Sequence, residues 1–117
     1  MLDSDKPHLV GIDEDVLSTG ITLYHLRDGA TTRIGADEST NDIALRGPAL
    51  LDEHCQIVLE DGVATLVPLE GALCMVNAAL IDGPTRLSQG CVVVLGKTNM
   101  FRWVEKRVAI WFGLSLS

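Results

Sequence analysis

The sequence predicts an all-β fold, a β-sandwich of about ten to eleven short strands in two packed sheets. Short apolar or alternating runs, each bounded by turn residues, recur about every ten residues, which is typical of a sandwich or barrel. No helical period spans ten residues before position 103. At 117 residues the chain is long enough to bury one core but too short for two. We therefore expect one domain whose sheets share a single core.

The expected strands follow one another with turn signals between them. They are residues 8–12, 20–26, 30–35, 42–45, 55–59, 63–68, 74–77, 79–81, 91–95 and 99–103. Asp28-Gly29 predicts a tight hairpin between the second and third strands, because glycine accepts a positive φ without a Cβ clash. Further turns are expected at Asp61-Gly62, Asp82-Gly83-Pro84, Gln89-Gly90 and Gly96-Lys97.

Charge and cysteine content narrow the classes of partner. Sixteen acidic against nine basic residues give a formal charge of -7, which repels nucleic-acid phosphates and anionic lipid headgroups. Cys55, Cys74 and Cys91 lie in apolar runs without metal-ligand spacing, so we expect buried free thiols in a reducing compartment. No apolar stretch is long enough to cross a bilayer. We expect a cytoplasmic domain that binds neither nucleic acid nor membrane directly and needs no cofactor.

The last fourteen residues, 104–117, depart from the strand pattern. Val104, Val108, Trp111 and Phe112 fall at helix-compatible spacing, yet the same segment could pair as an edge strand, and the sequence leaves both open. Trp111 and Phe112 need to be covered by the domain or by a partner, because a contiguous exposed aromatic patch is an association site.

Several motifs resemble the forkhead-associated (FHA) domain. They are Ile34-Gly35, the strand Asp42-Ile43-Ala44-Leu45, His54, and Val76-Asn77. The segments PHLVGIDEDVLSTGITLYHLRDG, DEHC and LGKTNMFRW are similar to the FHA domain of cargo-carrying motors of the third kinesin family. The resemblance implies an eleven-stranded sandwich of the FHA/SMAD-like kind over residues 7–103. Residues 1–6 would be an N-terminal flank and 104–117 a C-terminal extension.

In the family, loops at one end of the sandwich bind a phosphothreonine peptide. The resemblance places an arginine after the glycine and a serine three residues before the histidine, but this chain has Ala36 and Leu51 there. A phosphate dianion needs cationic and hydroxyl or amide donors. The carboxylates of Asp37, Glu38, Asp52 and Glu53 in the same loops would repel it.

Three residues remain as candidates for partner or phosphopeptide contact. Arg46 begins the second loop and could replace the missing cation, whereas Arg33 is expected to pair with nearby carboxylates; for both, a solvated surface arginine is the plainer interpretation. Asn77 resembles the asparagine that bonds the peptide backbone in the family, or simply forms a turn. Ala78 follows where the family has glycine, which suggests a less strained turn.

His54 and Gly35 are interpreted as structural supports of the loops. Adjacent strand residues point to opposite faces, so His54 and Cys55 do not form a catalytic pair, and a buried histidine bonded to the backbone is expected instead. Metal ligation by His54 with Cys74 or Cys91 lacks ligand spacing. No nucleophile motif of the GxSxG, HExxH or phosphate-loop kind occurs. We expect no catalytic residue.

The resemblance implies a non-catalytic interaction domain of a kinesin-like microtubule motor that serves intracellular transport. Such a domain packs with adjoining coiled-coil segments, influences dimerisation and autoinhibition, or binds a cargo adaptor. The parent motor would be ATP-driven and cytoskeleton-associated. The alternative is a working phosphothreonine-peptide receptor that uses Arg46 and Asn77.

Overall fold

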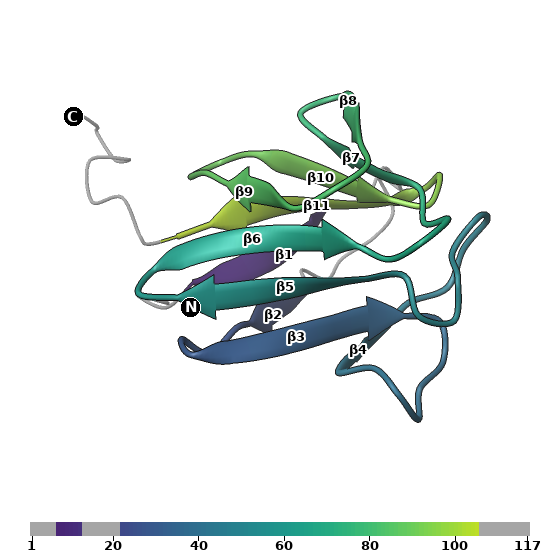
Figure 1. Cartoon of the computed structure of the whole chain (residues 1–117), viewed down its shortest axis with the longest axis horizontal. Helices are drawn as coiled ribbons and strands as arrows, with labels where there is room; N and C mark the ends of the chain where they lie inside the picture. Colours follow the sequence, from purple (N-terminus) through teal and green to yellow (C-terminus); the bar gives the residue numbers. More distant parts are fainter. Residues whose placement is uncertain (1–6, 13–21, 106–117) are drawn as a thin grey trace.

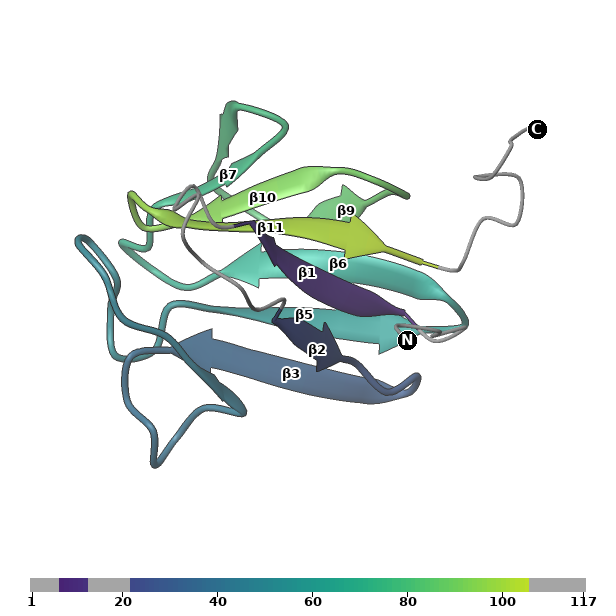
Figure 2. The ribbon, with the colours of Figure 1, turned by 180° about the vertical axis from the view of Figure 1, so that it is seen from behind.

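A computed structural model describes residues 7–12 and 22–105, in which two β-sheets face each other (Figures 1 and 2). One sheet has six strands in the order β2 (Leu23–His25), β1 (His8–Ile12), β11 (Asn99–Val104), β10 (Val92–Leu95), β7 (Cys74–Val76) and β8 (Ala79–Ile81). The other has five, in the order β4 (Ile43–Ala44), β3 (Ala30–Gly35), β5 (Cys55–Glu60), β6 (Val63–Pro68) and β9 (Thr85–Leu87). The all-β sandwich predicted from the sequence is confirmed.

One core lies between the two sheets because alternate residues of each strand point inward. On β5 the residues Cys55, Ile57 and Leu59 are buried while those between them are partly exposed. Trp103 of β11 is fully buried opposite them in the other sheet. Each such side chain contributes about 1.5–3 kcal/mol of hydrophobic stabilisation. All three cysteines are buried and free.

The hairpin between β5 and β6 forms where Asp61-Gly62 predicted a turn. Glu60 pairs with Val63, so the loop has two residues, and Asp61 and Gly62 have φ angles of 51° and 79°. This is the backbone of a type I′ turn, whose twist matches that of the flanking strands.

The hairpin predicted at Asp28-Gly29 is wrong, although the turn itself is present. Ala30 N–H donates to the Arg27 carbonyl at 3.2 Å, which closes the turn. However, β2 pairs with β1 in the six-stranded sheet, and β3 pairs with β4 and β5 in the five-stranded sheet. The chain thus crosses from one sheet to the other at this turn. Turn chemistry specifies the reversal, whereas burial of residues such as Ile34 against the core decides which sheet the next strand joins.

Strand β9, Thr85–Leu87, was not predicted from the sequence. It has three residues, follows Pro84 directly and pairs with β6 through Leu66 and Thr85. Its Leu87 is fully buried. A strand that offers one inward side chain has no alternation long enough to be recognised.

Some predictions concern residues outside the described ranges. Trp111 and Phe112 lie there, as do residues 1–6 and most of the segment 104–117 that was left open as helix or edge strand. Its first residue, Val104, is described and is the last residue of β11, paired with His8. The domain boundaries at 7 and 103 stay predictions.

Candidate functional site

Two loops at one end of the sandwich are fastened to each other by backbone hydrogen bonds. The first, residues 36–42, joins β3 to β4, and the second, 45–54, joins β4 to β5. Ala36 N–H donates to the Leu51 carbonyl at 2.9 Å, and Asp37 N–H to the Asp52 carbonyl at 3.2 Å. Because the Ala36 N–H is already bonded, it is not available to a phosphate. We call this pair of loops the loop cluster.

Gly35 and Asn41 let the two loops approach so closely. A Cβ on Gly35 would collide with the backbone carbonyl of Asp52, so any other residue would push the second loop away. The Asn41 side-chain amide donates to the carbonyls of Asp37 and Asp52, each at 2.7 Å, and so crosses from one loop to the other. Asn41 was not among the site residues predicted from the sequence, because its only signal was the general preference of asparagine for loops.

His54 lies fully buried at the base of the second loop. Its Nδ1 accepts the Leu51 N–H at 3.2 Å, and its Nε2 is 2.8 Å from the Leu73 carbonyl, to which it donates in this tautomer. His54 N–H also donates to the Ile34 carbonyl at 3.0 Å. These bonds connect the loop to the chain before β7 in the opposite sheet, as a structural support would.

His54 also contacts a cysteine, but in the other sheet. The free thiols of Cys55 on β5 and Cys74 on β7 lie close enough to affect each other's pKa, and Cys74 lies close enough to His54 to do the same. The contact with the Cys74 thiol, together with burial, raises the pKa of the Cys55 thiol. All three side chains are fully or almost fully buried, so no substrate reaches them. Sequence spacing gave no signal for this contact, because it forms only when the sheets pack.

The loop cluster is electronegative. Its loops carry the carboxylates Asp37, Glu38, Asp42, Asp52 and Glu53 against one cation, Arg46. Hydrogen bonds from the backbone N–H and then the hydroxyl of Ser39, at 2.9 and 2.8 Å, lower the pKa of Asp37 and keep it ionised.

Arg46 lies at the rim of the loop cluster and faces a carboxylate. Its Nη2 is 3.7 Å from Glu38 Oε1, and the two side chains are 93% and 77% exposed. An exposed pair of this kind contributes at most about 1 kcal/mol. Arg46 is therefore free to turn toward a ligand.

Arg33 lies one residue before Ile34 on the exposed side of β3. Its backbone N–H donates to Asp42 Oδ2 at 2.8 Å, and its C=O accepts the Asp42 N–H at 2.9 Å. Within the described part of the chain no ion pair of its side chain is found. The contact between Arg33 and Asp42 is thus made by the backbone of Arg33.

Asn77 is separated from Arg46 along β10. Asn77 makes two hydrogen bonds to Val92, at one end of that strand. Its backbone N–H donates to the Val92 carbonyl, and its Oδ1 accepts the Val92 N–H. Arg46 is held at the other end, where its carbonyl accepts the Asn99 amide at 3.0 Å, and Asn99 pairs with Leu95. Val92 and Leu95 are three residue steps apart, about 10 Å along the strand. The structure does not bring Asn77 and Arg46 together.

The turn at Asn77-Ala78 is more strained than the sequence suggested, which corrects that interpretation. Asn77 and Ala78 have φ angles of 50° and 68°. Asparagine tolerates this left-handed region, but alanine pays for it with a clash between its Cβ and the following carbonyl.

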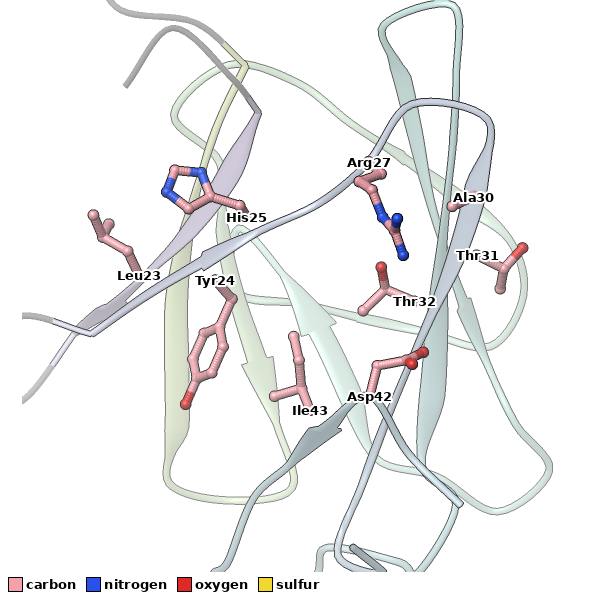
Figure 3. A pocket seen from close by; sticks show the side chains of 9 residues that line it. All are labelled: Leu23, Tyr24, His25, Arg27, Ala30, Thr31, Thr32, Asp42 and Ile43. Atoms are coloured by element: carbon pink, nitrogen blue, oxygen red, sulfur yellow. The ribbon is translucent and has the colours of Figure 1, made fainter. Parts of the chain in front are cut away.

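A groove opens beside the loop cluster, between the free edges of the two sheets (Figure 3). It has a volume of about 320 Å³ and is lined by β2, β3 and the start of β4. Figure 3 shows Arg27 extending toward Thr32, with Asp42 beyond it. Because the Asp42 carboxylate would repel an anion there, we assign no phosphate site to this groove.

Among residues 7–12 and 22–105, no group of three or more histidine, cysteine or acidic side chains could hold a metal ion. The same residues form no helix that is long and apolar enough to span a membrane.

The FHA domain model matches residues 32–96, more than half of the chain, and the chain therefore belongs to the FHA family. FHA domains are protein-interaction modules, and this one is not an enzyme. The mouse kinesin-like protein KIF16B is 52% identical over 110 residues, which cover 93% of this chain but 8% of that protein. The chain thus corresponds to the FHA region of a much longer kinesin-like relative.

Solved structures agree with the fold. The FHA domain of CT664 from Chlamydia trachomatis has a TM-score of 0.75 at 25% identity, over 85% of this chain and 96% of that one. EmbR from Mycobacterium tuberculosis, solved with a low-affinity phosphopeptide, has a TM-score of 0.73 at 20% identity, over 87% of this chain and 25% of that one.

Proposed function

We propose that this chain is a protein-interaction domain of a kinesin-like microtubule motor. In the motor it contributes to intramolecular packing, dimerisation and autoinhibition, or binds a cargo adaptor. The 52% identity to mouse KIF16B supports this assignment. The domain would work in the cytoplasm on microtubule-associated motors, with protein partners, and ATP hydrolysis would belong to a region outside this chain.

The charge of the loop cluster is the observation that carries the proposal. Ala36 follows Gly35, its N–H is bonded to the Leu51 carbonyl, and one arginine stands among five carboxylates. A phosphothreonine carries nearly two negative charges and needs several charge-assisted hydrogen bonds to offset its desolvation. The loop cluster repels such a group, so a phosphate-independent partner fits it better.

A second candidate function is phosphothreonine-peptide binding, and the exposure of Arg46 favours it. Its pairing with Glu38 is weak enough to be broken by a ligand of higher charge. EmbR, which shares the fold, was solved with a phosphopeptide. A ligand that contacts both Arg46 and Asn77 would need to extend along β10 from Leu95 to Val92, about 10 Å or three residues of extended peptide.

Titration of the chain with matched phosphothreonine and threonine peptide libraries separates the two candidates. We expect equal affinities for each matched pair. A gain of about tenfold for the phosphorylated peptide, or about 1.4 kcal/mol, would favour the receptor function if it disappears in Arg46→Ala. Arg33→Ala is the matched control, because Arg33 lies outside the loop cluster.

A second measurement tests the motor assignment directly. Sedimentation velocity is compared for the chain alone and for the chain mixed with the segments that flank the matched region in mouse KIF16B. We expect a faster-sedimenting complex. Absence of a complex with any flanking segment would contradict intramolecular packing.

A further inference from the structure

The outward face of the six-stranded sheet carries a continuous apolar row across five strands. Cross-strand pairing places the following residues side by side: Ile12, Met100, Val94, Met75 and Leu80. Residues that pair directly lie on the same face of a sheet. Each alternates along its strand with inward positions, and Leu80 is 68% exposed while the other four are partly exposed. The row therefore faces away from the core.

A second row runs beside the first. Leu23 pairs with Val10, Val10 with Arg102, and Arg102 with Val92. Arg102 is exposed, and its Nη1 donates to the Gly90 carbonyl at 3.1 Å. We call the two rows together the outer apolar face. It contains eight apolar side chains, one arginine and no carboxylate.

The other outward face of the same sandwich shows that this is not a general property of the domain. Across the five-stranded sheet the corresponding row is Thr31, Val58, Thr65 and Arg86. It contains one apolar side chain between polar and charged neighbours, as expected for a face in water. Composition thus distinguishes the outer apolar face from the solvent face of the sheet behind it.

A sheet with apolar side chains on both faces is stable when both faces are covered, usually by a helix or a second sheet. The five-strand row spans about 19 Å, four strand spacings. A helix of about 13 residues has that length, and its apolar stripe fits one row with the edge of the next. A second copy fits less well, because it would add another Arg102 to the interface and no carboxylate to pair with either arginine.

We propose that the outer apolar face docks an amphipathic α-helix from the same motor polypeptide, with an acidic residue that pairs with Arg102. The inference rests on the proposed function and gives it a location and a partner chemistry. The matched region is 8% of mouse KIF16B, so most of that polypeptide lies outside it and is long enough to contain such a helix. A helix on the same chain binds at high effective concentration, so modest contacts suffice.

Nuclear magnetic resonance locates the helix. The isotopically labelled chain is titrated with overlapping peptides of about 20 residues from both sides of the matched region in mouse KIF16B. We expect one acidic amphipathic peptide to shift the amide signals of the outer apolar face and to leave those of Val58 and Thr65 unchanged.

Two pairs of variants test the surface and the charge. Val94→Glu is expected to lower the affinity for that peptide at least about tenfold. Val58→Glu, the same change at a partly exposed valine of the opposite face, is expected to leave the affinity within about twofold. Arg102→Glu is expected to lower the affinity for the peptide by a similar factor. Arg86→Glu, on the opposite face, is the control and is expected to leave it unchanged. Amide spectra of each variant establish that it is folded.

Three results would overturn the inference. If a peptide shifts only the amide signals of the loop cluster, the interface lies there and not on the outer apolar face, and the proposed function stands. Binding by none of the peptides would contradict both. Concentration-dependent self-association that is lost in Val94→Glu would show that a second copy, and not a helix, covers the face.

Discussion

Ala78 holds a backbone conformation that suits glycine. Its φ of 68° lies in the left-handed region, where an L-residue with a Cβ costs roughly 1–2 kcal/mol. The residue is exposed, so its methyl group offers little packing in return. The two-residue turn between β7 and β8 forces this conformation because it must have the type I′ backbone.

Ala78→Gly is therefore expected to stabilise the domain. Relief of the strain exceeds the extra entropy that glycine loses on folding, for a net gain of about 0.5–1 kcal/mol. Urea denaturation measures the change. Ala79→Gly, the neighbouring exposed alanine at the start of β8, is the control and is expected to lower the free energy of unfolding.

His54 connects three segments of backbone from a buried position. His54→Ala would leave the Leu51 N–H and the Leu73 carbonyl without partners and would open a cavity. We expect the free energy of unfolding to fall by about 3–5 kcal/mol. Glu53→Ala, an exposed change at the adjacent position, should stay within about 0.5 kcal/mol in the same urea titration. A loss below about 1 kcal/mol for His54→Ala would show that water replaces the ring.

At the level of strands and turns, the sequence predicted well what depends on local chemistry. The β5–β6 hairpin follows from alternating apolar residues around Asp61-Gly62, and all these signals lie within fourteen residues. The connection at Asp28-Gly29 was assigned to one sheet because local chemistry cannot tell which sheet the next strand joins. Strand β9 was missed because three residues with one buried leucine show no period.

The loop cluster could be predicted in position but only partly in structure. The resemblance located Gly35, which lies against the Asp52 carbonyl, and His54, whose ring accepts the Leu51 N–H. It did not show that Asn41 crosses between them, or that Asn77 lies at the far end of β7. Both depend on where strands end relative to one another, which is decided by the register between strands.

The loop cluster also allows a test by restoration. In Ala36→Arg combined with Leu51→Ser, the arginine and serine that the family resemblance implies stand in the two vacated positions. We expect a gain of at least about tenfold in affinity for a phosphothreonine peptide over its threonine counterpart, measured by calorimetry. Thr31→Arg combined with Leu51→Ser adds the same charge away from the loops and should not gain. Equal gains in both would mean that net charge, and not position, excludes the phosphate.

The whole molecule has one core, to which both sheets contribute. Its buried residues run from Ile57 in the five-stranded sheet to Trp103 and Val93 in the six-stranded sheet. Neither sheet can leave the other without exposing this surface, so a domain of this size is expected to unfold in one cooperative step. His54 and Cys74 come into contact because the two sheets pack on this core, so their spacing in the sequence could not reveal the contact.

The three buried thiols test this cooperativity. Cys55 belongs to the five-stranded sheet, Cys74 to the six-stranded sheet, and Cys91 precedes β10; they are 1%, 0% and 4% exposed. A maleimide reagent should reach them only through global unfolding, so mass spectrometry should find one common labelling rate that rises with urea in step with the unfolded fraction. Labelling of Cys91 well ahead of Cys55 would instead show that the six-stranded sheet opens by itself. That sheet carries the outer apolar face, so separate opening there would indicate that its stability depends on the helix that we propose to cover it.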